Sequence, residues 1–218
     1  MTFCLETIVI KPENNQKIKN AIILLHGYGG DGKDISVLSL NWKRHLSNTV
    51  FICPNGPEKC LINPSGYQWF DLSKDDPQYI LEQSKKSEIK LIKFIEEIKK
   101  EFKLENNKIC LSGFSQGCMM SINVGLINEL KFNCIVGFSG KIIDQNDLKK
   151  RKKNSTDVLL FHGENDEIVS PSFLLEAKDF LIRNGIKVGT HLIKDCGHHI
   201  PIEASSLALN FILKKFNI

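Results

Sequence analysis

A serine between two glycines, in the segment GFSQG at residues 113–117, is the most chemically specific feature of the sequence. It follows an apolar run expected to form a strand, Lys108–Ser112, and precedes a helical pattern. A serine at a tight strand-to-helix turn projects its hydroxyl from the sheet edge, beside helix N–H groups that favour negative charge. The glycines allow the strand and the helix to approach closely. The pattern therefore predicts that Ser115 is a nucleophile.

A nucleophilic serine requires a general base, and the base requires a carboxylate that orients it. Asp166 follows the apolar run DVLLF, and His198 follows the next expected strand. In a parallel sheet the loops after these strands converge on the edge where Ser115 lies. Asp166 is therefore the predicted orienting carboxylate and His198 the predicted base. His199, the next residue, remains an alternative base.

Other titratable side chains are expected to have supporting or solvated roles. His26 and His162 each begin a His-Gly turn after a strand, which favours a role in loop geometry. Asp144 and Asp147 lie among lysines and asparagines, which favours a solvated loop. The basic run at residues 149–153 is expected to be a solvated connection, because no aromatic residues interleave with its charges.

Ester chemistry at a serine also requires two hydrogen-bond donors aimed at the developing oxyanion. One is expected to be the backbone N–H of Gln116, the residue after the nucleophile. The second should come from a loop after an early strand, and the glycine-rich segment at residues 27–32 fits. We assign it to the N–H of Tyr28. Nucleotide binding is disfavoured, because GYGGDG matches neither GxGxxG nor a P-loop.

The elements that must position these residues alternate between apolar strands and amphipathic helices. The central strands are apolar without alternation, as expected for strands covered by helices on both faces. This order predicts the α/β class, with a mostly parallel central sheet and helices on both faces. Strands are predicted at Phe3–Ile10, Ala21–Leu25, Val50–Cys53, Lys108–Ser112, Cys134–Phe138, Asp157–Phe161 and Lys187–Ile193. Helices are predicted over Pro77–Phe102, after Gly117, from Ser170-Pro171 towards Arg183, and around Ala204–Phe211.

The segment Asn55–Pro77 shows neither periodicity. A loop of about 20 residues without regular structure is uncommon in a compact domain and is often functional. Leu61, Ile62 and Tyr67 in this segment are candidates for an apolar lid, and an ordinary surface loop is the equal alternative.

Length, composition and charge exclude several classes of protein. The 218 residues, 42% hydrophobic and 25% charged, predict one globular domain over residues 1–218. No transmembrane helix, secretory signal or metal site is expected, and the seven cysteines form no CxxC pair, which favours a reduced, cytoplasmic protein. The net charge of +4 comes mostly from lysine, which argues against nucleic-acid recognition.

Five motifs in order resemble the phospholipase/carboxylesterase family of α/β-hydrolases, which includes the acyl-protein thioesterases. They are LLHGYGGDG at residues 24–32, WFD at 69–71, GFSQG at 113–117, HGENDEIV at 162–169 and GHHI at 197–200. The resemblance implies the α/β-hydrolase fold, with the chain order Ser115, Asp166, His198 for the triad and Tyr28 with Gln116 as oxyanion donors. It also implies that Trp69 and Phe70 line the acyl side of the site, that no cofactor is needed, and that the chain forms a homodimer.

Two residues depart from this family's usual pattern. Cys118 stands where the family usually has a small residue such as glycine, and Tyr28 replaces a more frequent leucine. Neither belongs to the expected triad, but both are placed to reshape the acyl pocket.

The expected function is hydrolysis of carboxylic esters through a Ser-His-Asp triad and an acyl-enzyme. The expected partner is a small-molecule acyl ester or an acylated substrate. An acyl-protein thioesterase or a lysophospholipase acting on long acyl chains is the alternative within the same chemistry. A non-catalytic binding module on a hydrolase scaffold is the alternative of a different class.

Overall fold

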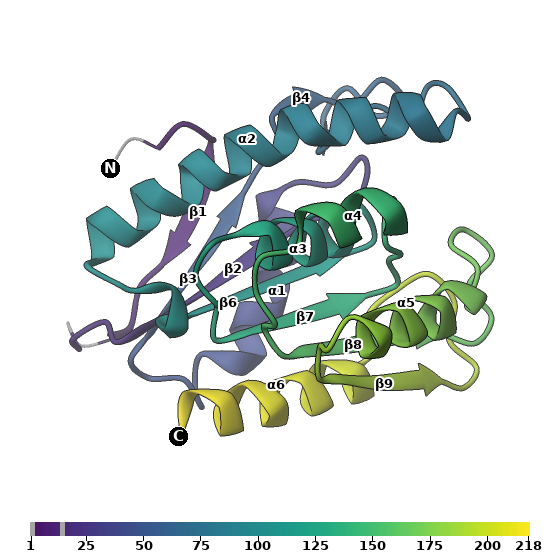
Figure 1. Cartoon of the computed structure of the whole chain (residues 1–218). Helices are drawn as coiled ribbons and strands as arrows, with labels where there is room; N and C mark the ends of the chain where they lie inside the picture. The colour runs from purple at the N-terminus through teal and green to yellow at the C-terminus, as the bar shows by residue number, and fades with distance from the viewer. Residues whose placement is uncertain (1–2, 14–15) are drawn as a thin grey trace.

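One seven-stranded sheet forms the centre of the protein, in a computed structural model that describes residues 3–13 and 16–218. Neighbouring strands are parallel, except that β1 pairs antiparallel with β3 at one edge. The prediction of a mostly parallel sheet is confirmed (Figure 1). In spatial order the strands are β1 (Thr7–Ile10), β3 (Thr49–Pro54), β2 (Asn20–Leu25), β6 (Ile109–Phe114), β7 (Cys134–Phe138), β8 (Val158–Gly163) and β9 (Val188–Ile193).

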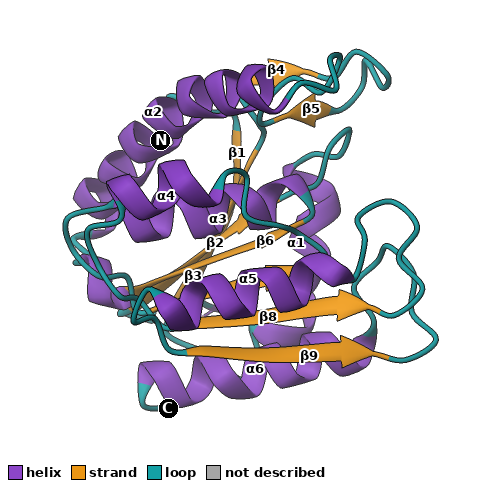
Figure 2. Cartoon of the chain, turned by 45° about the vertical axis from the view of Figure 1, so that its right-hand side comes forward, coloured by secondary structure: helices purple, strands orange, loops and turns teal. Residues whose placement is uncertain are grey.

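Helices cover both faces of this sheet, as predicted (Figures 1 and 2). Two of them, α1 (Gly32–Trp42) and α6 (Ile202–Phe216), pack their buried side chains into a core on one face. The other face is covered by α2 (Pro77–Phe102), α3 (Gln116–Ile127), α4 (Gln145–Arg151) and α5 (Ser172–Arg183). A 3₁₀ turn, η2 (Asn106–Lys108), leads into β6.

Burial explains the continuous apolar character of the central strands. Every residue of β2, β3, β7 and β8 is buried, because helices cover both of their faces. The edge strand β9 is buried fully only at Ile193. The first edge strand is shorter than predicted: it begins at Thr7 rather than Phe3.

The long helix α2 has the bounds that its apolar stripe predicts. Its first turn contains Pro77, and the Asp76 side chain caps it by accepting hydrogen bonds from the N–H groups of Gln78 and Tyr79, at 2.9 and 3.3 Å. Leu91, Ile95 and Ile98 of the predicted stripe are fully buried. A proline, a capping carboxylate and a clean stripe together make this helix readable from sequence.

The helix α1 was not predicted, because its sequence lacks a clean apolar stripe. Its buried face contains the polar Ser39 between Ile35 and Trp42, whereas Val37 and Leu40 point outward with more than half of their surface exposed. The helix follows β2 in the chain, and Val37 lines a pocket together with Gly27 and Tyr28 of the loop after β2.

The basic run at 149–153 is solvated at Lys149, Lys150 and Lys153, as expected, but the loop expected around Asp144 and Asp147 is in fact largely helical. Residues 145–151 form α4, which Asp144 caps by accepting a 2.7 Å hydrogen bond from the N–H of Asp147. Arg151 donates to both carboxylate oxygens of Glu88 in α2, at 2.7 and 3.0 Å. The ion pair with Glu88 attaches this short helix to α2. No local sequence pattern shows such a contact between distant residues.

The segment Asn55–Pro77 is not wholly irregular, contrary to expectation. It contains a small antiparallel ribbon of β4 (Glu58–Lys59) and β5 (Tyr67–Gln68), seen at the top of Figure 2. Leu61 and Ile62, in the loop between these strands, are 70% and 77% exposed. The ribbon therefore displays two apolar side chains at its end.

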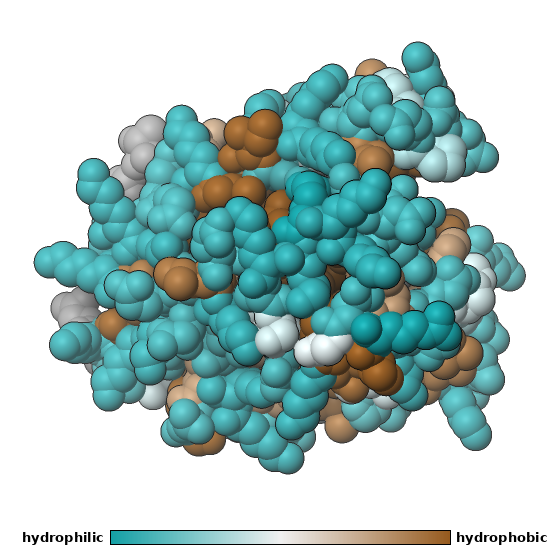
Figure 3. Space-filling view, in the orientation of Figure 1, coloured by the Kyte–Doolittle hydropathy of each residue, from teal (hydrophilic) through white to brown (hydrophobic). Residues whose placement is uncertain are grey.

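The carboxyl ends of the parallel strands meet at one edge of the sheet, on the right in Figure 1. The space-filling outline is indented on that side (Figure 3). Loops at such an edge form the ligand-binding crevices of open α/β sheets.

No helix among the described residues is long and apolar enough to cross a membrane.

Candidate active site

Ser115 occupies a strained turn between β6 and α3. Its backbone has φ 52° and ψ −115°, a region that side-chain-bearing residues rarely adopt. The Ser115 N–H donates a 2.8 Å hydrogen bond to the carbonyl of Phe138, which ties the turn to the end of β7. A Cβ at Gly113 would collide with the backbone of Gly117, and one at Gly117 with the carbonyl of Leu25. The GFSQG pattern is therefore the one that this turn requires.

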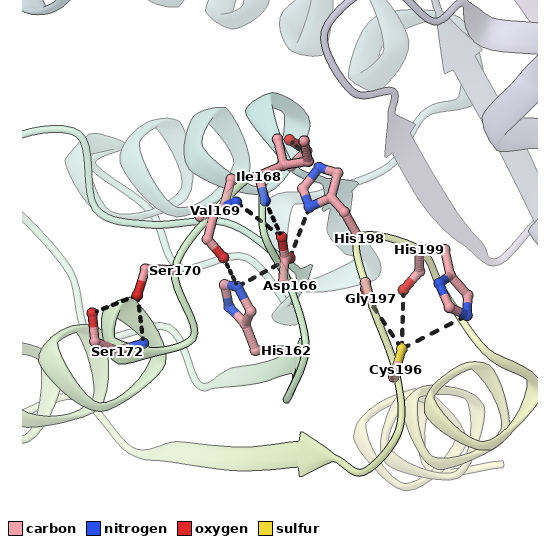
Figure 4. A network of polar contacts seen from close by, with 11 residues as sticks. His162, Asp166, Ile168, Val169, Ser170, Ser172, Cys196, Gly197, His198 and His199 are labelled. Carbon is pink, nitrogen blue, oxygen red and sulfur yellow. Dashed lines mark hydrogen bonds and ion pairs between the residues drawn. The ribbon is translucent and has the colours of Figure 1, made fainter.

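The structure brings Ser115, His198 and Asp166 into one hydrogen-bonded chain, although 83 and 32 residues separate consecutive members. Ser115 Oγ lies 3.0 Å from His198 Nε2, and His198 Nδ1 lies 2.7 Å from Asp166 Oδ2. Figure 4 shows the His198 ring against the Asp166 carboxylate. This spacing suits transfer of a proton from the serine to the imidazole.

Asp166 is buried and accepts hydrogen bonds on both carboxylate oxygens. Oδ1 accepts from the N–H groups of Ile168 and Val169, at 3.0 and 2.9 Å, and Oδ2 accepts from His198. Burial alone would raise the pKa of the Asp166 carboxyl, but these hydrogen bonds outweigh it and lower the pKa below its ordinary value. The carboxylate is therefore ionised at neutral pH.

A second histidine also contacts Asp166. His162 is buried at the end of β8, and its Nε2–H donates to the Val169 carbonyl at 2.8 Å and lies 3.3 Å from Asp166 Oδ2. Burial lowers the pKa of His162, which keeps the ring neutral. Its Nδ1 atom has no partner among the described residues. His162 thus supports the 166–169 turn, a role consistent with its predicted place in loop geometry.

His199 points away from this chain of hydrogen bonds (Figure 4). Its Nε2 atom lies 3.7 Å from the Sγ atom of the buried Cys196. The two adjacent histidines, which the sequence left as alternatives, therefore have different surroundings. His198, whose ring packs against Phe114 with centroids 4.7 Å apart, is the one beside Ser115.

The two predicted oxyanion donors flank the serine. The N–H of Gln116 belongs to the first residue of α3, and the N–H of Tyr28 lies in the loop after β2. Neither N–H donates to another group in the described parts of the chain. Gly27 lies against Phe114 and Ser115, since a Cβ added at Gly27 would be 3.4 Å from the Cβ of Ser115.

Backbone hydrogen bonds from two other segments fix this loop. Tyr67 of β5 accepts from the Gly29 N–H and donates to the Gly30 carbonyl, at 2.9 and 2.8 Å. The buried His26 ring donates from Nδ1 to the Gly27 carbonyl and accepts at Nε2 from the Gly56 N–H, at 2.6 and 2.8 Å. The β4–β5 ribbon thus helps to set the position of the Tyr28 N–H.

Trp69 and Phe70, predicted to line the acyl side of the site, are buried in the core and are at most 2% exposed. The indole N–H of Trp69 donates to the His26 carbonyl at 3.0 Å. The Gln116 side chain accepts from the Trp69 N–H and donates to the Phe70 carbonyl, at 2.8 and 2.6 Å. These two residues thus contact the loop after β2 and the first turn of α3, which carry the predicted oxyanion donors. Contact between their rings and an acyl chain stays a prediction.

The Gln116 side chain is a site residue that sequence reasoning used only through its backbone. It joins the segment that follows β5 to the first turn of α3. The sequence shows only that Gln116 lies inside GFSQG, whereas its burial, which makes hydrogen-bond partners necessary, is known from the structure alone.

Cys118, which departs from the usual family pattern, packs against Gly137 and Gly140. Burial raises the pKa of its thiol to about 12. The thiol is therefore protonated and fills space beneath the turn that carries Ser115.

A known protein family matches most of the chain. The family described as Phospholipase/Carboxylesterase matches residues 6–216. The chain belongs to this family. Its members are ester hydrolases, so the predictions of an α/β-hydrolase fold and a carboxylic ester hydrolase are confirmed at the level of the family.

Individual relatives in the phospholipase/carboxylesterase family agree in length and fold. Acyl-protein thioesterase 1 of Yarrowia lipolytica is 27% identical over 205 residues, with 88% of this chain and 89% of that protein covered. Esterase YpfH of Escherichia coli is 25% identical, with 88% and 81% covered. The crystal structure of esterase PE8 is 31% identical, with a TM-score of 0.92 over 96% of this chain and 98% of that one.

Proposed function

We propose that this protein is a serine hydrolase that cleaves carboxylic esters through Ser115, His198 and Asp166. The observation that carries the proposal is the continuous chain of hydrogen bonds from Ser115 Oγ through the imidazole to the buried carboxylate, at 3.0 and 2.7 Å. Membership of the phospholipase/carboxylesterase family supports the class of reaction.

In the acylation half-reaction, Ser115 Oγ attacks the ester carbonyl carbon while His198 Nε2 takes the hydroxyl proton. The carbonyl oxygen becomes an oxyanion, which accepts hydrogen bonds from the N–H groups of Tyr28 and Gln116. The bond from carbon to the leaving oxygen then breaks. His198 Nε2–H gives its proton to that oxygen, so an alcohol departs and an acyl-serine remains.

In the deacylation half-reaction, a water molecule takes the place of the departed alcohol. His198 removes a proton from the water as it attacks the acyl carbonyl, and the same two N–H groups hold the oxyanion. The bond to Ser115 Oγ breaks, and His198 returns the proton to the serine. The products are a carboxylic acid and the free enzyme.

Asp166 contributes through its negative charge and its hydrogen bond to His198 Nδ1. The hydrogen bond fixes the tautomer in which Nε2 is free to accept the serine proton. The ionised carboxylate then stabilises the imidazolium that forms in the transition state.

The first test is initial rates on p-nitrophenyl esters from acetyl to palmitoyl, for wild type and Ser115→Ala. We expect the variant to lose at least about 10³-fold in kcat, because it lacks the nucleophile. A Ser115→Ala protein that keeps most of the wild-type rate would contradict the proposal.

A second candidate, hydrolysis of long-chain thioesters on acylated proteins, has support from the names of two relatives. These are acyl-protein thioesterase 1 of Yarrowia lipolytica and its homologue 1 of Dictyostelium discoideum, 27% and 28% identical to this chain. The exposed Leu61 and Ile62 on the β4–β5 ribbon could cover a long acyl chain. Faster cleavage of a palmitoyl-cysteine peptide than of p-nitrophenyl acetate would favour this candidate, and absence of cleavage would exclude it. A lysophospholipid assayed alongside would test lysophospholipase activity.

We also propose that the protein works in the cytoplasm. All seven cysteines are free thiols, and five of them lie in or beside the sheet core, at Cys53, Cys110, Cys118, Cys134 and Cys196. Free thiols in this number suit a reducing compartment. A homodimer remains a prediction from the family resemblance, and light scattering in solution would test it.

A further inference from the structure

A groove of about 360 Å³ opens beside His198, the predicted base, and extends along α1. Its catalytic end is formed by His198 and by Gly27 and Tyr28 of the oxyanion loop. Its apolar wall comes from three parts of the chain: Ile35, Val37 and Leu38 of α1, Phe114 before the nucleophile, and Ile200 after the base. His26, Gly30, Asp34 and His199 complete the lining. Its size falls within the range of small-molecule pockets, about 300–1,000 Å³.

The wall is apolar although it faces solvent. Val37 is 59% exposed, and Phe114 and Ile200 are partly exposed. The helix thus presents hydrocarbon to water next to the reacting atoms, which is unfavourable unless a ligand covers it.

Charge further restricts what the groove can hold. Asp34 lies on its wall, and none of the described residues that line it is a lysine or an arginine. An anionic group such as a phosphodiester would meet this carboxylate, and the basic side chains that line the groove are imidazoles, at His26, His198 and His199, rather than permanent cations. The groove therefore suits an uncharged hydrocarbon.

The position of His198 indicates which part of an ester enters the groove. The imidazole must give its proton to the leaving oxygen, so the leaving group lies on the side of the tetrahedral carbon that faces His198. The groove wall continues from His198 to Ile200 and across to Val37. A hydrocarbon chain attached to the leaving oxygen therefore extends along α1.

We propose that this groove is the leaving-group site, and that it selects esters of uncharged, hydrocarbon-rich alcohols or the corresponding thiols. The inference rests on the proposed serine-esterase function and adds the class of leaving group to it. It disfavours lysophospholipids, whose leaving group carries a phosphate.

A kinetic signature separates this site from an acyl pocket. Every acetate ester gives the same acetyl-Ser115 enzyme once its alcohol has departed, so the groove acts on acylation and not on deacylation. Longer alcohols should raise kcat/KM by about twofold to fourfold for each methylene that the groove covers, from the free energy of burying that group. Where deacylation limits turnover, kcat should stay the same along the series.

The test uses two ester series and two matched variants of α1. One series is methyl, butyl, hexyl and octyl acetate, in which only the alcohol changes. The other is the methyl esters of acetic, butyric, hexanoic and octanoic acids, in which only the acyl group changes. Val37→Trp places an indole in the groove, whereas Leu40→Trp places one on the same helix at a residue that is 56% exposed and does not line the groove.

We expect Val37→Trp to lower the ratio of kcat/KM for hexyl over methyl acetate by at least about tenfold, and to leave the slope of the acyl series unchanged. Leu40→Trp should keep the wild-type ratio. A flattened acyl series in Val37→Trp would assign the groove to the acyl chain and overturn the inference, as would unchanged ratios in both series. Far-ultraviolet circular dichroism of both variants checks folding, and Ile200→Trp supplies a second obstruction from the opposite wall.

Failure of the inference and failure of the proposed function give different results. If wild type hydrolyses methyl acetate and Ser115→Ala does not, the esterase function stands whatever the slopes show. If wild type hydrolyses neither series, the proposed function fails, and the leaving-group assignment fails with it.

Discussion

Two buried carboxylates in this protein are held by different kinds of donors. Asp166, at the carboxyl edge of the sheet, accepts from two backbone N–H groups and from His198, and its Oδ2 atom lies 3.3 Å from His162 Nε2. Glu88, on α2, accepts from the Asn123 amide at 2.6 Å and from both terminal nitrogens of Arg151. Both side chains are almost fully buried, so each needs several donors to remain ionised.

The two networks differ because a permanently charged arginine, Arg151, pairs with Glu88, whereas the partners of Asp166 among the described residues include no lysine or arginine. Arg151 pairs with Glu88, and the hydrogen bonds from Glu88 raise the pKa of the Arg151 guanidinium. The pair joins α2 to α4, and the negative charge of Glu88 is balanced by the positive charge of Arg151. The two backbone donors of Asp166 carry no charge, and burial lowers the pKa of His162, so that ring supplies no permanent cation. The negative charge of Asp166 therefore remains available to stabilise His198 when that ring takes a proton. The Glu88 network stabilises the fold, and the Asp166 network is suited to catalysis.

The largest expected effect separates the two adjacent histidines. His198→Ala should lower kcat on p-nitrophenyl acetate by about 10⁴-fold, because Ser115 loses the base 3.0 Å from its hydroxyl. His199→Ala should cost less than about tenfold, since its ring faces Cys196. Steady-state kinetics on both variants provides the measurement. Equal losses in the two would mean that the base has been wrongly assigned.

Exchanging each buried carboxylate for an amide tests the comparison itself. Asp166→Asn should lower kcat by about 10³-fold or more, because the amide can neither stabilise the imidazolium nor fix the correct tautomer. Glu88→Gln should leave kcat within about threefold, and should lower the free energy of unfolding by about 2 kcal/mol as Arg151 loses its charged partner. This value lies below the roughly 3–5 kcal/mol typical of a fully buried pair, because the Arg151 side chain is 29% exposed and also contacts Asp147.

Rates on p-nitrophenyl acetate and urea unfolding of both proteins would check these expectations. A Glu88→Gln protein with normal stability, or one with a 10³-fold loss of kcat, would remove the distinction between the two networks.

His162 should have a smaller effect on catalysis, acting as a positioning residue for Asp166. His162→Ala removes the donor that lies between the Val169 carbonyl and the Asp166 carboxylate, and should lower kcat about tenfold. His162→Gln can place an amide N–H near the same position and should recover part of the loss. The pH dependence of kcat/KM should shift in the alanine variant and return towards wild type in the glutamine variant. A loss without any shift would indicate a purely structural role.

The smallest expected effect is the change of the free energy of unfolding with pH. Burial lowers the pKa values of His26 and His162, so below the ordinary value of 6.5 the unfolded chain binds protons that the folded protein does not. Their stabilising contribution is complete above pH 6.5 and is lost as the pH falls towards 5. We expect a decrease of at most about 1.4 kcal/mol per pH unit for each histidine. Urea unfolding at pH 7, 6 and 5 should show a smaller decrease in His162→Gln than in wild type.

Asp166 acts in a separate and more acidic window. Its folded pKa is lowered, so its contribution is present above its ordinary value of 3.8 and is lost as the pH falls through the lower folded value. Unfolding measured below pH 4 in Asp166→Asn should therefore show a weaker acid dependence than in wild type. An unchanged profile would mean that the carboxylate is not stabilised as described.

The sequence predicts the features of this protein that depend on local chemistry. The apolar run DVLLF can only be a strand covered on both faces, and the parallel sheet then brings Asp166 and His198 to the edge near Ser115. The bounds of α2 follow from Asp76, Pro77 and a regular stripe. The helix at Ser170-Pro171 begins slightly later than predicted, at Ser172.

Features that depend on distant contacts could not be predicted. Nothing near Arg151 in the sequence reveals Glu88, 63 residues away, which pairs with it and secures α4. The polar Ser39 on the buried face interrupts the apolar periodicity of α1, so the sequence predicted neither this helix nor the groove that it lines. The burial of Trp69 and Phe70 likewise follows from the side chain of Gln116, which holds their backbone.

The most direct test of the catalytic assignment is the location of a fluorophosphonate adduct by mass spectrometry. The phosphonyl group replaces the proton of an activated serine hydroxyl and releases fluoride. In wild type we predict stoichiometric labelling of the tryptic peptide at residues 109–131, with fragment ions placing the adduct on Ser115 rather than on Ser112 or Ser121. His198→Ala should label at least about 10³-fold more slowly. An unlabelled wild-type protein, or an adduct at another residue, would contradict the account.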